Sequence, residues 1–317
     1  MSQIQLGVLY GGEHFHRNIL PVISKINKIN IVGVHTRNKK KYNNSKLLYQ
    51  SKNKILNDKN INTIYISSPN SFHASNIIGA LKKNKNVICE KPLCLSLKDY
   101  NKIFHFSSMT NKTVFEGFMF IYHDMFNYII KVINKDQRKI KNISAKFMFP
   151  HLKRNNIRYK KQLGGGAFYD CGCYLFKFLS LLKNYKDNIK KKPKIIYSKN
   201  FKIDTYGKFT TKISNTRINL EWGFGYKYIN QVIINFGNKK IIAERFFSKN
   251  SDNRSKIKLI FENKRTTKIS WFKKQNHFKS MFLYYLKMLK SNKLKTTYRN
   301  ELENYQNIFL NKIPYKK

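Results

Sequence analysis

Two adjacent charges, Glu90 and Lys91, follow directly after an apolar stretch that ends at Cys89. Charged side chains are rarely placed at the end of a buried strand without a partner, because removing a charge from water is costly. Pro92 then stops the strand, and proline lowers the cost of a cis peptide bond at this point. The tripeptide therefore indicates either a ligand-binding strand end or a strand that is followed by a solvated turn.

A second group of reactive side chains lies in the other half of the chain. Gly164–Gly166 come before an apolar helical stretch that carries Asp170 and Tyr174. Residues four apart share one face of an α-helix, so this carboxylate and this phenol form a proton-handling pair. The alternative is a capping aspartate beside a core tyrosine. The glycine run indicates a close approach of the backbone to a ligand or to a sheet.

The elements that must position Glu90 and Lys91 are predicted from the pattern of residues 1–118. Apolar strands alternate there with helical patterns, which indicates βαβ units and a parallel sheet. The strands are expected at 4–10, 29–35, 63–67, 86–89 and 113–116, and the helices at 15–26, 41–51, 74–83 and 97–109. In such a sheet, ligands bind at the carboxyl ends of the strands, and this is where Glu90 and Lys91 fall.

The first strand-to-helix turn has the sequence Tyr10-Gly11-Gly12-Glu13-His14-Phe15. A dinucleotide-binding fold has the pattern G-x-G-x-x-G at this turn, and only its second glycine, Gly12, is kept. If a dinucleotide binds, its phosphates meet the backbone N–H groups of Gly12, Glu13, His14 and Phe15. The alternative interpretation is a simple glycine turn.

Two further turns fall at the same predicted edge. The second strand is followed by Thr36 and Arg37, with no carboxylate to bind the ribose of NAD, whereas Arg37 suits the 2′-phosphate of NADP. The pattern therefore favours NADP over NAD. After the third strand come Ser68, Pro69, Asn70 and His73, which either border the cofactor or form a helix cap with a surface histidine.

Residues 119–317 have a different pattern. An extended run at 143–149 is followed by strands at 195–198, 210–214, 217–222, 231–236, 240–244, 257–261 and 266–271, and then by helices at 277–290 and 299–310. The short turns between these strands indicate a largely antiparallel sheet. We therefore expect a doubly wound parallel α/β domain at 1–118 and an α+β domain with an open sheet at 119–317. The last helix can return to the first domain.

The formal charge of +47 comes from 63 basic and 16 acidic residues. The lysines are spread along the whole chain, and no nucleic-acid-binding module is present, so we expect no nucleic-acid partner. A nucleic-acid-binding protein remains the alternative that this charge suggests. The charge should raise the association rate of phosphorylated or nucleotide-linked substrates.

The remaining composition indicates a cytoplasmic globular protein. We see no signal peptide, and no apolar run is long enough to span a bilayer, so we expect no membrane contact. The four cysteines are Cys89, Cys94, Cys171 and Cys173, and their spacing does not suit zinc. We therefore expect buried thiols and no metal site.

Four motifs in this order and spacing resemble the Gfo/Idh/MocA family, the group of glucose-fructose oxidoreductase and inositol dehydrogenase. They are Ser68-Pro69-Asn70-Ser71-Phe72-His73, Cys89-Glu90-Lys91-Pro92-Leu93, Glu116-Gly117-Phe118-Met119, and the stretch from Gly164 to Tyr174. The resemblance implies an N-terminal Rossmann domain that binds NAD or NADP, with Glu90 and Lys91 among its contacts. It also implies a C-terminal domain that covers the substrate and supports a homodimer or homotetramer.

The catalytic positions of that family fall on Lys91, Asp170 and Tyr174, where many members carry histidine at the last position. The resemblance implies hydride transfer to or from a carbon of a sugar, sugar nucleotide or cyclitol. Two departures from the family stand out: the glycine pattern of the first turn is eroded, and Ile121 and Asp124 occupy positions where many relatives have arginine and proline. The eroded glycine pattern supports an alternative, a catalytically silent relative that acts as a scaffold or sensor.

Overall fold

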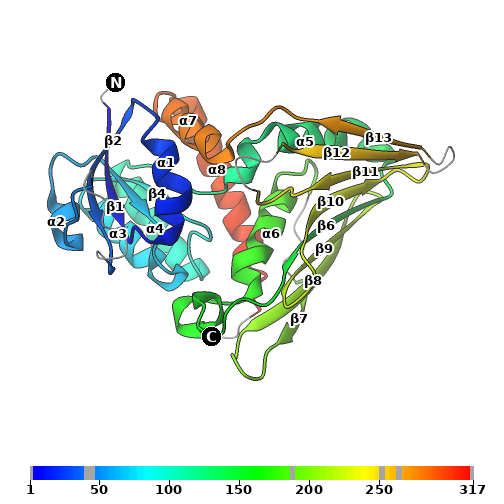
Figure 1. Cartoon of the computed structure of the whole chain (residues 1–317), viewed down its shortest axis with the longest axis horizontal. Coiled ribbons are helices and arrows are strands. Elements are labelled where there is room, and N and C mark those ends of the chain that lie inside the picture. The colour runs from blue at the N-terminus through cyan, green and yellow to red at the C-terminus, as the bar shows by residue number, and fades with distance from the viewer. Residues whose placement is uncertain (1–2, 39–46, 186–189, 250–253, 262–265, 315–317) are drawn as a thin grey trace. The chain divides into compact units, whose positions relative to one another are not determined.

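The computed structural model describes the whole chain except residues 1–2, 39–46, 186–189, 250–253, 262–265 and 315–317. The chain divides into two compact units (Figure 1). The first unit contains Met1–Phe118 and Met281–Leu302, and the second contains Met119–Ser280 and Glu303–Lys317. Each unit is built around one sheet.

The first unit contains a parallel sheet of five strands in the order β2-β1-β3-β4-β5. The strands are β1 (Ile4–Leu9), β2 (Ile29–His35), β3 (Thr63–Ile66), β4 (Asn86–Cys89) and β5 (Val114–Glu116). Strand β3 is buried along its whole length, and β1 and β4 each have one half-buried residue, because helices and loops cover both faces of a parallel sheet. The parallel α/β sheet predicted from the sequence is confirmed.

The helices of this sheet begin and end where local sequence signals allow. They are η1 (Phe15–Ile19), a π-helical turn, followed by α1 (Leu20–Ile23), α2 (Lys52–Asn57), η2 (Asn70–Phe72), α3 (His73–Lys82) and α4 (Leu97–Thr110). The Ser96 hydroxyl caps α4 by accepting a hydrogen bond from the Asp99 N–H at 3.1 Å. Asn111 ends the helix in the left-handed region, with φ of 51°.

One predicted helix is wrong in position. The sequence pattern placed a helix at 41–51, whereas α2 begins at Lys52. Ser51 explains the difference, because its hydroxyl accepts a hydrogen bond from the Lys54 N–H at 3.2 Å and so fixes the start of the helix. Tyr49 lies before this cap in a bridge to Val34. Residues 41–46 of the predicted helix lie outside the described residues.

The last two helices, α7 (His277–Leu289) and α8 (Asn292–Leu310), each contribute residues to both units. Within the first unit, their aromatic side chains pack against the parallel sheet. Phe115 of β5 lies 5.1 Å from Tyr285 and 4.9 Å from Tyr298, measured between ring centroids. The Tyr298 hydroxyl oxygen also accepts a hydrogen bond from the Glu116 N–H at 2.8 Å. These contacts hold the carboxyl end of β5.

The second unit contains eight strands in the order β13-β12-β11-β10-β6-β9-β8-β7. They are β6 (Asn142–Phe149), β7 (Lys194–Tyr197), β8 (Asp204–Ile213), β9 (Thr216–Phe224), β10 (Ile229–Asn235), β11 (Lys239–Glu244), β12 (Lys256–Phe261) and β13 (Thr266–Trp271). Strands β6 and β9 are parallel, and the other pairs are antiparallel. The predicted open, mainly antiparallel sheet is therefore confirmed, and Figure 1 shows its strands from green β6 to orange β13.

Helical segments before and after β6 complete this unit. They are η3 (Met119–Tyr122), α5 (Asp124–Asp136), η4 (Gln137–Lys139), η5 (Ile157–Tyr159), η6 (Lys161–Leu163), the π-helical η7 (Phe168–Gly172) and α6 (Cys173–Ser180). Aromatic rings form the contact between η7–α6 and the sheet. Phe168 and Phe176 each lie 5.7 Å from the fully buried Trp222 of β9. Large buried rings of this kind dominate core energetics.

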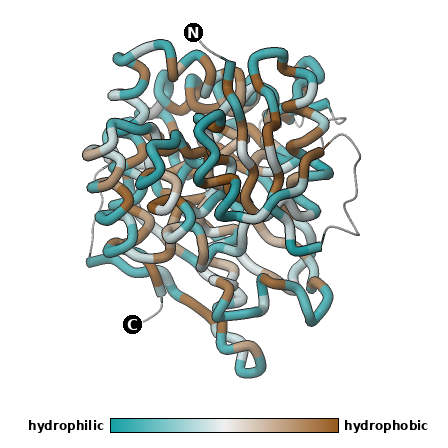
Figure 2. The backbone as a smooth tube through the Cα atoms, turned by 90° about the vertical axis from the view of Figure 1, so that its left-hand side faces the viewer, coloured by the Kyte–Doolittle hydropathy of each residue, from teal (hydrophilic) through white to brown (hydrophobic). Residues whose placement is uncertain are grey.

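Hydrophilic and hydrophobic residues alternate along most of the described chain. Figure 2 shows short brown, hydrophobic stretches separated by teal, hydrophilic ones throughout the tube. The chain therefore carries its polar residues in every part of the fold rather than in one basic segment.

Candidate functional site

Three neighbouring strands of the first unit end at one edge of the sheet. Leu9 of β1 lies opposite Ile66 of β3, and Ile66 lies opposite Cys89 of β4. The strand order places β2 on one side of β1 and β3 on the other, so the chain reverses its direction of winding at this point. In open α/β sheets the ligand crevice lies at such a reversal, outside the carboxyl ends of the strands.

The turn after β1 keeps the shape of a glycine turn although its first residue is a tyrosine. Tyr10 has φ of 62°, in the left-handed region that glycine adopts without cost. The Gly11 N–H donates to the His35 carbonyl at 2.8 Å. A Cβ on Gly11 would lie 2.7 Å from Val34 Cγ1, so only glycine fits there.

Gly12 leaves open the space beside its Cα, and its own N–H donates to the Tyr10 carbonyl at 2.7 Å. Among the described residues, a Cβ built on Gly12 would meet only the Tyr10 carbonyl oxygen, at 3.8 Å. A helical segment starts at the next residue, Glu13. The first N–H groups of a helix carry partial positive charge and attract phosphate. The backbone from Gly12 to Phe15 thus fits the pyrophosphate of a dinucleotide.

The third position of the glycine pattern is filled by the fully buried Phe15. Its ring packs 6.0 Å from the ring of Tyr65, a residue of β3. A glycine here lets the helix approach the strand closely, whereas a phenyl ring requires more room. The helix meets this requirement with the π-helical turn η1, which begins at Phe15 and is wider than an α-helical turn.

Glu90 joins the turn after β1 to the end of β4. Its Oε1 accepts a hydrogen bond from the Tyr65 hydroxyl at 2.6 Å and lies 3.2 Å from His14 Nε2. Burial would raise the pKa of Glu90, but the attraction of His14 and these hydrogen bonds outweigh it, so the pKa lies below its usual range. The carboxylate therefore stays ionised beside Lys91.

His73 braces two of the loops. It is only 1% exposed, and its Nδ1 and Nε2 lie 2.7 Å from the Pro92 carbonyl and 2.9 Å from the Ser68 carbonyl. Burial lowers its pKa against the opposing effect of these two carbonyls. The side chain is enclosed, so any effect of His73 on a ligand passes through the loops that it joins.

Lys91 is half-buried, and its peptide bond to Pro92 is cis. The next residue is anchored from another strand, because the Leu93 N–H donates to Glu116 Oε1 at 2.7 Å. Glu116 is buried at the end of β5. Sequence reasoning used Glu116 only as part of a motif, and the structure shows that its carboxylate fixes the loop that carries Lys91.

The other predicted cofactor residues lie around the same edge. Thr36 is buried, and its hydroxyl accepts the Asn38 N–H at 3.4 Å. Arg37 is exposed, and its guanidinium carbon lies 5.8 Å from the centroid of the Tyr10 ring. Ser68 is buried, with its hydroxyl accepting from Asn76 Nδ2 at 3.2 Å. Pro69 is also buried, and Asn70 begins η2 in a half-buried position.

In the second unit, Asp170 is held by a residue that the sequence did not indicate. Arg158 Nε donates to Asp170 Oδ2 at 2.6 Å, and the carboxylate side chain is 14% exposed. The attraction of Asp170 raises the pKa of Arg158, with a smaller contribution from Tyr174. Arg158 therefore lies within electrostatic reach of both predicted residues. No local spacing rule connects positions so far apart, which is why the pattern of the sequence missed it.

The glycine run before Asp170 makes its close approach to protein backbone. A Cβ on Gly165 would lie 2.4 Å from the Arg158 carbonyl oxygen. The Gly166 N–H donates to that same oxygen at 3.0 Å, and the Gly165 N–H donates to the Lys160 carbonyl at 3.1 Å. The run thus packs against the segment that presents Arg158, whereas the sequence pattern indicated an approach to a ligand or to a sheet.

Tyr174 lies in the first turn of α6 and is 6% exposed. Its ring packs among Phe120, Phe147 and Phe247 at centroid distances of 5.6, 5.3 and 6.3 Å. Its hydroxyl donates to the thioether sulfur of Met119 at 3.8 Å. A thioether is a weak acceptor, so this contact holds the hydroxyl loosely.

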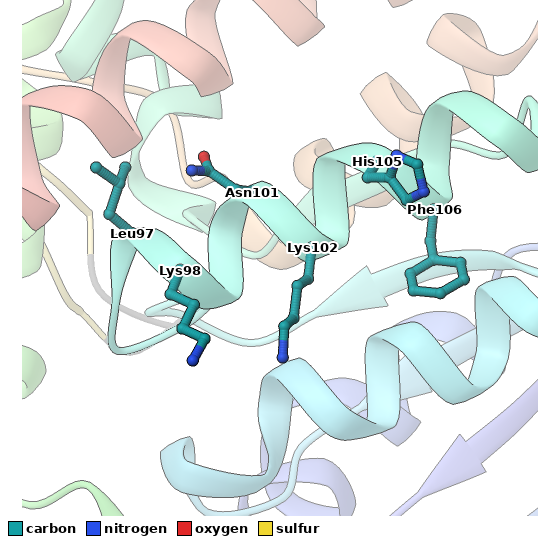
Figure 3. Close-up of a pocket in the computed structure, with 6 residues that line it drawn as sticks. All are labelled: Leu97, Lys98, Asn101, Lys102, His105 and Phe106. Carbon is teal, nitrogen blue, oxygen red and sulfur yellow. The ribbon is translucent and has the colours of Figure 1, made fainter.

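The structure thus gathers the predicted cofactor residues at one sheet edge of the first unit, and places Asp170 and Tyr174 with Arg158 in the second. The hollow in Figure 3 is a different feature. Its volume is about 520 Å³, and it is lined by Leu97, Lys98, Asn101, Lys102, His105 and Phe106. All six residues belong to α4, and none is a predicted site residue.

The four cysteines are buried and unbridged. Burial raises the pKa of the thiols of Cys89 and Cys94 well above the usual range, which makes them poor nucleophiles. Within the described ranges, no three His, Cys, Asp or Glu residues are grouped to hold a metal ion. No helix in the part of the chain that the structure describes is long and apolar enough to span a membrane.

The fold and the strand-edge geometry define a Rossmann-type protein with a second, open-sheet domain. Residues 7–118 match the model of the GFO_IDH_MocA family, described as an oxidoreductase family with an NAD-binding Rossmann fold. The match bears out the resemblance to the Gfo/Idh/MocA family that the motifs of this segment indicated.

Curated relatives match part of the chain. A dTDP-3,4-didehydro-2,6-dideoxy-α-D-glucose 3-reductase from Saccharopolyspora spinosa is 25% identical over 177 residues, 54% of this chain and 53% of the relative. The D-xylose 1-dehydrogenase (NADP(+)) 2 of Haloferax volcanii is 26% identical over 44% of each chain. The matched segment thus spans about half the length of these relatives.

Solved structures match over nearly the whole chain. KijD10, a 3-ketoreductase from Actinomadura kijaniata in complex with NADP and TDP-benzene, superposes with a TM-score of 0.84. The sequence identity is 17%, and the match covers 96% of this chain and 95% of that one. An aldose-aldose oxidoreductase from Caulobacter crescentus superposes with a TM-score of 0.77 at 14% identity, covering 96% and 98% of the two chains. At these identities the likeness establishes the fold.

Proposed function

We propose that this chain is an NAD(P)-dependent oxidoreductase that transfers hydride to or from a carbon of a sugar, sugar nucleotide or cyclitol. One observation carries the proposal. A Rossmann sheet edge bears Glu90-Lys91-Pro92 inside the segment that matches the family. In the same chain, Arg158 Nε donates to Asp170 Oδ2 at 2.6 Å, and Asp170 lies four residues before Tyr174. Relatives named for sugar and sugar-nucleotide chemistry support the substrate class.

The residues of the first unit suit cofactor binding. The backbone from Gly12 to Phe15 would hold the pyrophosphate, and Arg37 would pair with a 2′-phosphate. NADP is therefore the cofactor that we favour over NAD, which agrees with the NADP named in the KijD10 complex. When bound, the nicotinamide supplies or accepts the hydride.

The remaining task for the protein is to move one proton and orient the substrate. We assign the proton exchange with the substrate oxygen to Tyr174. A tyrosine hydroxyl has a pKa near ~10 in water, so it needs a neighbouring positive charge to act at neutral pH. Arg158, which interacts electrostatically with Tyr174, supplies one such charge. Lys91 donates a hydrogen bond to the reacting oxygen, and Asp170 orients the substrate hydroxyl groups.

The strong positive charge of the chain supports a phosphate-bearing substrate. A formal charge of +47 raises the local concentration of anions such as sugar nucleotides. We propose that the protein acts in the cytoplasm as a homodimer or homotetramer. The two edge strands of the second sheet carry exposed apolar residues, including Ile196 of β7 and Trp271 of β13. Light scattering on the purified protein measures the assembly.

A fluorescence titration with NADPH and NADH tests the first half of the proposal. We expect saturable binding of at least one of them, with NADPH the tighter. A screen of ketosugars, sugar nucleotides and inositols, followed by NAD(P)H absorbance, then tests the second half. If neither dinucleotide binds, the oxidoreductase assignment fails, and the catalytically silent scaffold suggested by Tyr10 and Phe15 in place of glycines is favoured.

A further inference from the structure

Tyr10 stands where the dinucleotide pattern has its first glycine, yet its side chain is not folded into the core. The ring is half-buried at the sheet edge and packs against residues from two other strand ends. The ring of His35 meets it edge-on, with centroids 4.9 Å apart. The ring of Phe72 lies nearly parallel to it, with centroids 6.3 Å apart and an angle of 10° between the planes.

A positive charge is part of the same cluster. The guanidinium carbon of Arg37 lies 5.8 Å from the Tyr10 ring centroid. Phe72 is 39% exposed, and Arg37 is exposed as well. The cluster of Tyr10, His35, Arg37 and Phe72 therefore presents flat apolar rings and a guanidinium group to solvent, next to the open backbone of Gly12.

The backbone of Tyr10 shows that this side chain is held against a conformational preference. With φ of 62°, the residue adopts a conformation that disfavours every side chain bearing a Cβ, and aromatic residues are uncommon there. Glycine would give the same turn without that strain. Because strained residues cluster at functional sites, an observed outlier beside a ligand-binding edge motivates a functional hypothesis.

We propose that Tyr10 is a purine-stacking residue, which binds the adenine of the dinucleotide on the aromatic surface that it forms with Phe72 and holds Arg37 for the adenosine 2′-phosphate. The inference rests on the proposed function, because it assumes that a dinucleotide binds at this edge. In the glycine pattern, affinity for the dinucleotide comes from close approach of the backbone. Here we assign part of that affinity to the Tyr10 side chain.

The chemistry of the cluster fits this ligand. Every purine has two π-faces, and stacking on an aromatic side chain is worth about 1–3 kcal/mol per base when the side chain is cut to alanine, or roughly 5- to 150-fold in affinity. Arginine stacks on aromatic rings and binds phosphate through a fixed fork of donors. The Tyr10 ring therefore contributes to binding of both the adenine and the 2′-phosphate, whereas it does not contribute to binding of the nicotinamide end.

The test compares Tyr10→Gly and Tyr10→Phe with the wild type by calorimetric titration. The probes are NADPH, adenosine 2′,5′-bisphosphate and reduced nicotinamide mononucleotide. Tyr10→Gly should lower the affinity for NADPH and for the bisphosphate by about tenfold or more, and should leave the affinity for the mononucleotide unchanged. Tyr10→Phe should stay within about twofold of the wild type, since the ring is kept.

Thermal unfolding separates this role from a structural one. Tyr10→Gly relieves the strained φ, so its melting temperature should equal or exceed that of the wild type while its affinity falls. A residue that only packed the turn would lose stability and affinity together. Phe72→Ala provides a second route to the same loss, from an exposed side chain on another loop. Met109→Ala, at a residue that is 69% exposed at the end of α4, is the matched control and should change nothing.

Two results would overturn the inference, and they are distinguishable. If the wild type binds NADPH and the bisphosphate but Tyr10→Gly and Phe72→Ala bind both equally well or more tightly, the rings do not stack the purine, and the proposed function stands without them. If the wild type binds neither NADPH nor NADH, the proposed function fails and the inference fails with it.

Discussion

Two turns of this chain differ in how many glycines they contain and in what those glycines contact. The turn after β1 lost two positions of a dinucleotide pattern to Tyr10 and Phe15, yet Tyr10 keeps the left-handed backbone and η1 widens around Phe15. The turn before η7 kept all of Gly164–Gly166, and Gly165 packs against the backbone of Arg158. A lost glycine therefore need not mean a lost shape, and a retained glycine need not mark a ligand.

The largest expected effect concerns Tyr174 of α6, in the unit that contains the second turn. Tyr174→Phe removes the proposed proton donor, and losing a proton-transfer group typically costs about 10²–10⁴ in rate. Stability should change by about 1 kcal/mol or less, because the contact of the hydroxyl with the Met119 thioether is weak. Steady-state kinetics and urea unfolding measure the two quantities.

Tyr305→Phe is the control for that experiment. It removes a hydroxyl that donates to the Cys173 carbonyl at 3.4 Å in the same unit, so turnover should be unchanged. Equal turnover of Tyr174→Phe and the wild type would remove Tyr174 from the reaction.

A pair of glycine substitutions sharpens the comparison itself. Gly165→Ala places a methyl group 2.4 Å from the Arg158 carbonyl, so overpacking should lower the free energy of unfolding by about 1–3 kcal/mol. Gly12→Ala meets an atom only at 3.8 Å, so the fold should lose less than about 0.5 kcal/mol. Urea denaturation of both variants tests the contrast.

The same pair should behave in the opposite way toward cofactor. The methyl group of Gly12→Ala lies on the open side of the turn and should weaken the binding of NADPH. Gly165→Ala changes the second unit and should leave NADPH binding unchanged. A Gly12→Ala protein that binds NADPH as the wild type does would show that the open backbone is not a phosphate site.

A further predicted effect is a pH dependence of stability at the first turn. Burial opposes ionisation of Glu90, but His14 and Tyr65 outweigh it, and the pKa of Glu90 in the folded protein lies below its ordinary value of 4.5. The stabilisation is therefore complete above about pH 4.5 and is lost as the pH falls through the lower folded pKa. Glu90→Gln should cost about 1 kcal/mol at neutral pH, and this difference should shrink on acidification. A difference that is constant with pH, measured by urea unfolding, would contradict the ionised role of Glu90.

Much of the fold follows from periodicity along the chain. Short apolar strands alternating with helical patterns predicted the parallel sheet, and closely spaced strands predicted the antiparallel one. Both predictions succeed because the apolar pattern of a strand depends on which of its residues are buried. Helix positions were harder, as α2 shows. The sequence analysis also did not predict α5, whose buried residues Met125, Phe126, Ile129 and Ile133 do follow a helical spacing.

The candidate site was less accessible to sequence reasoning wherever distant residues meet. Glu90 and Lys91 could be placed at a strand end from local pattern alone. The contact of Arg158 with Asp170, the anchoring of Leu93 by Glu116, and the cluster around Tyr10 depend on how separate segments pack. Such contacts are set by tertiary structure, and a single sequence carries no spacing rule for them.

The central claim is that this chain performs hydride transfer with Lys91 as a participant. The most direct measurement mixes NADPH-loaded wild type, and in parallel Lys91→Ala, with a panel of keto-sugar nucleotides and follows the loss of reduced cofactor in a single turnover. The account predicts oxidation by the wild type with at least one member of the panel, slowed by about 10²–10⁴ in Lys91→Ala. Equal rates for the two proteins would contradict it.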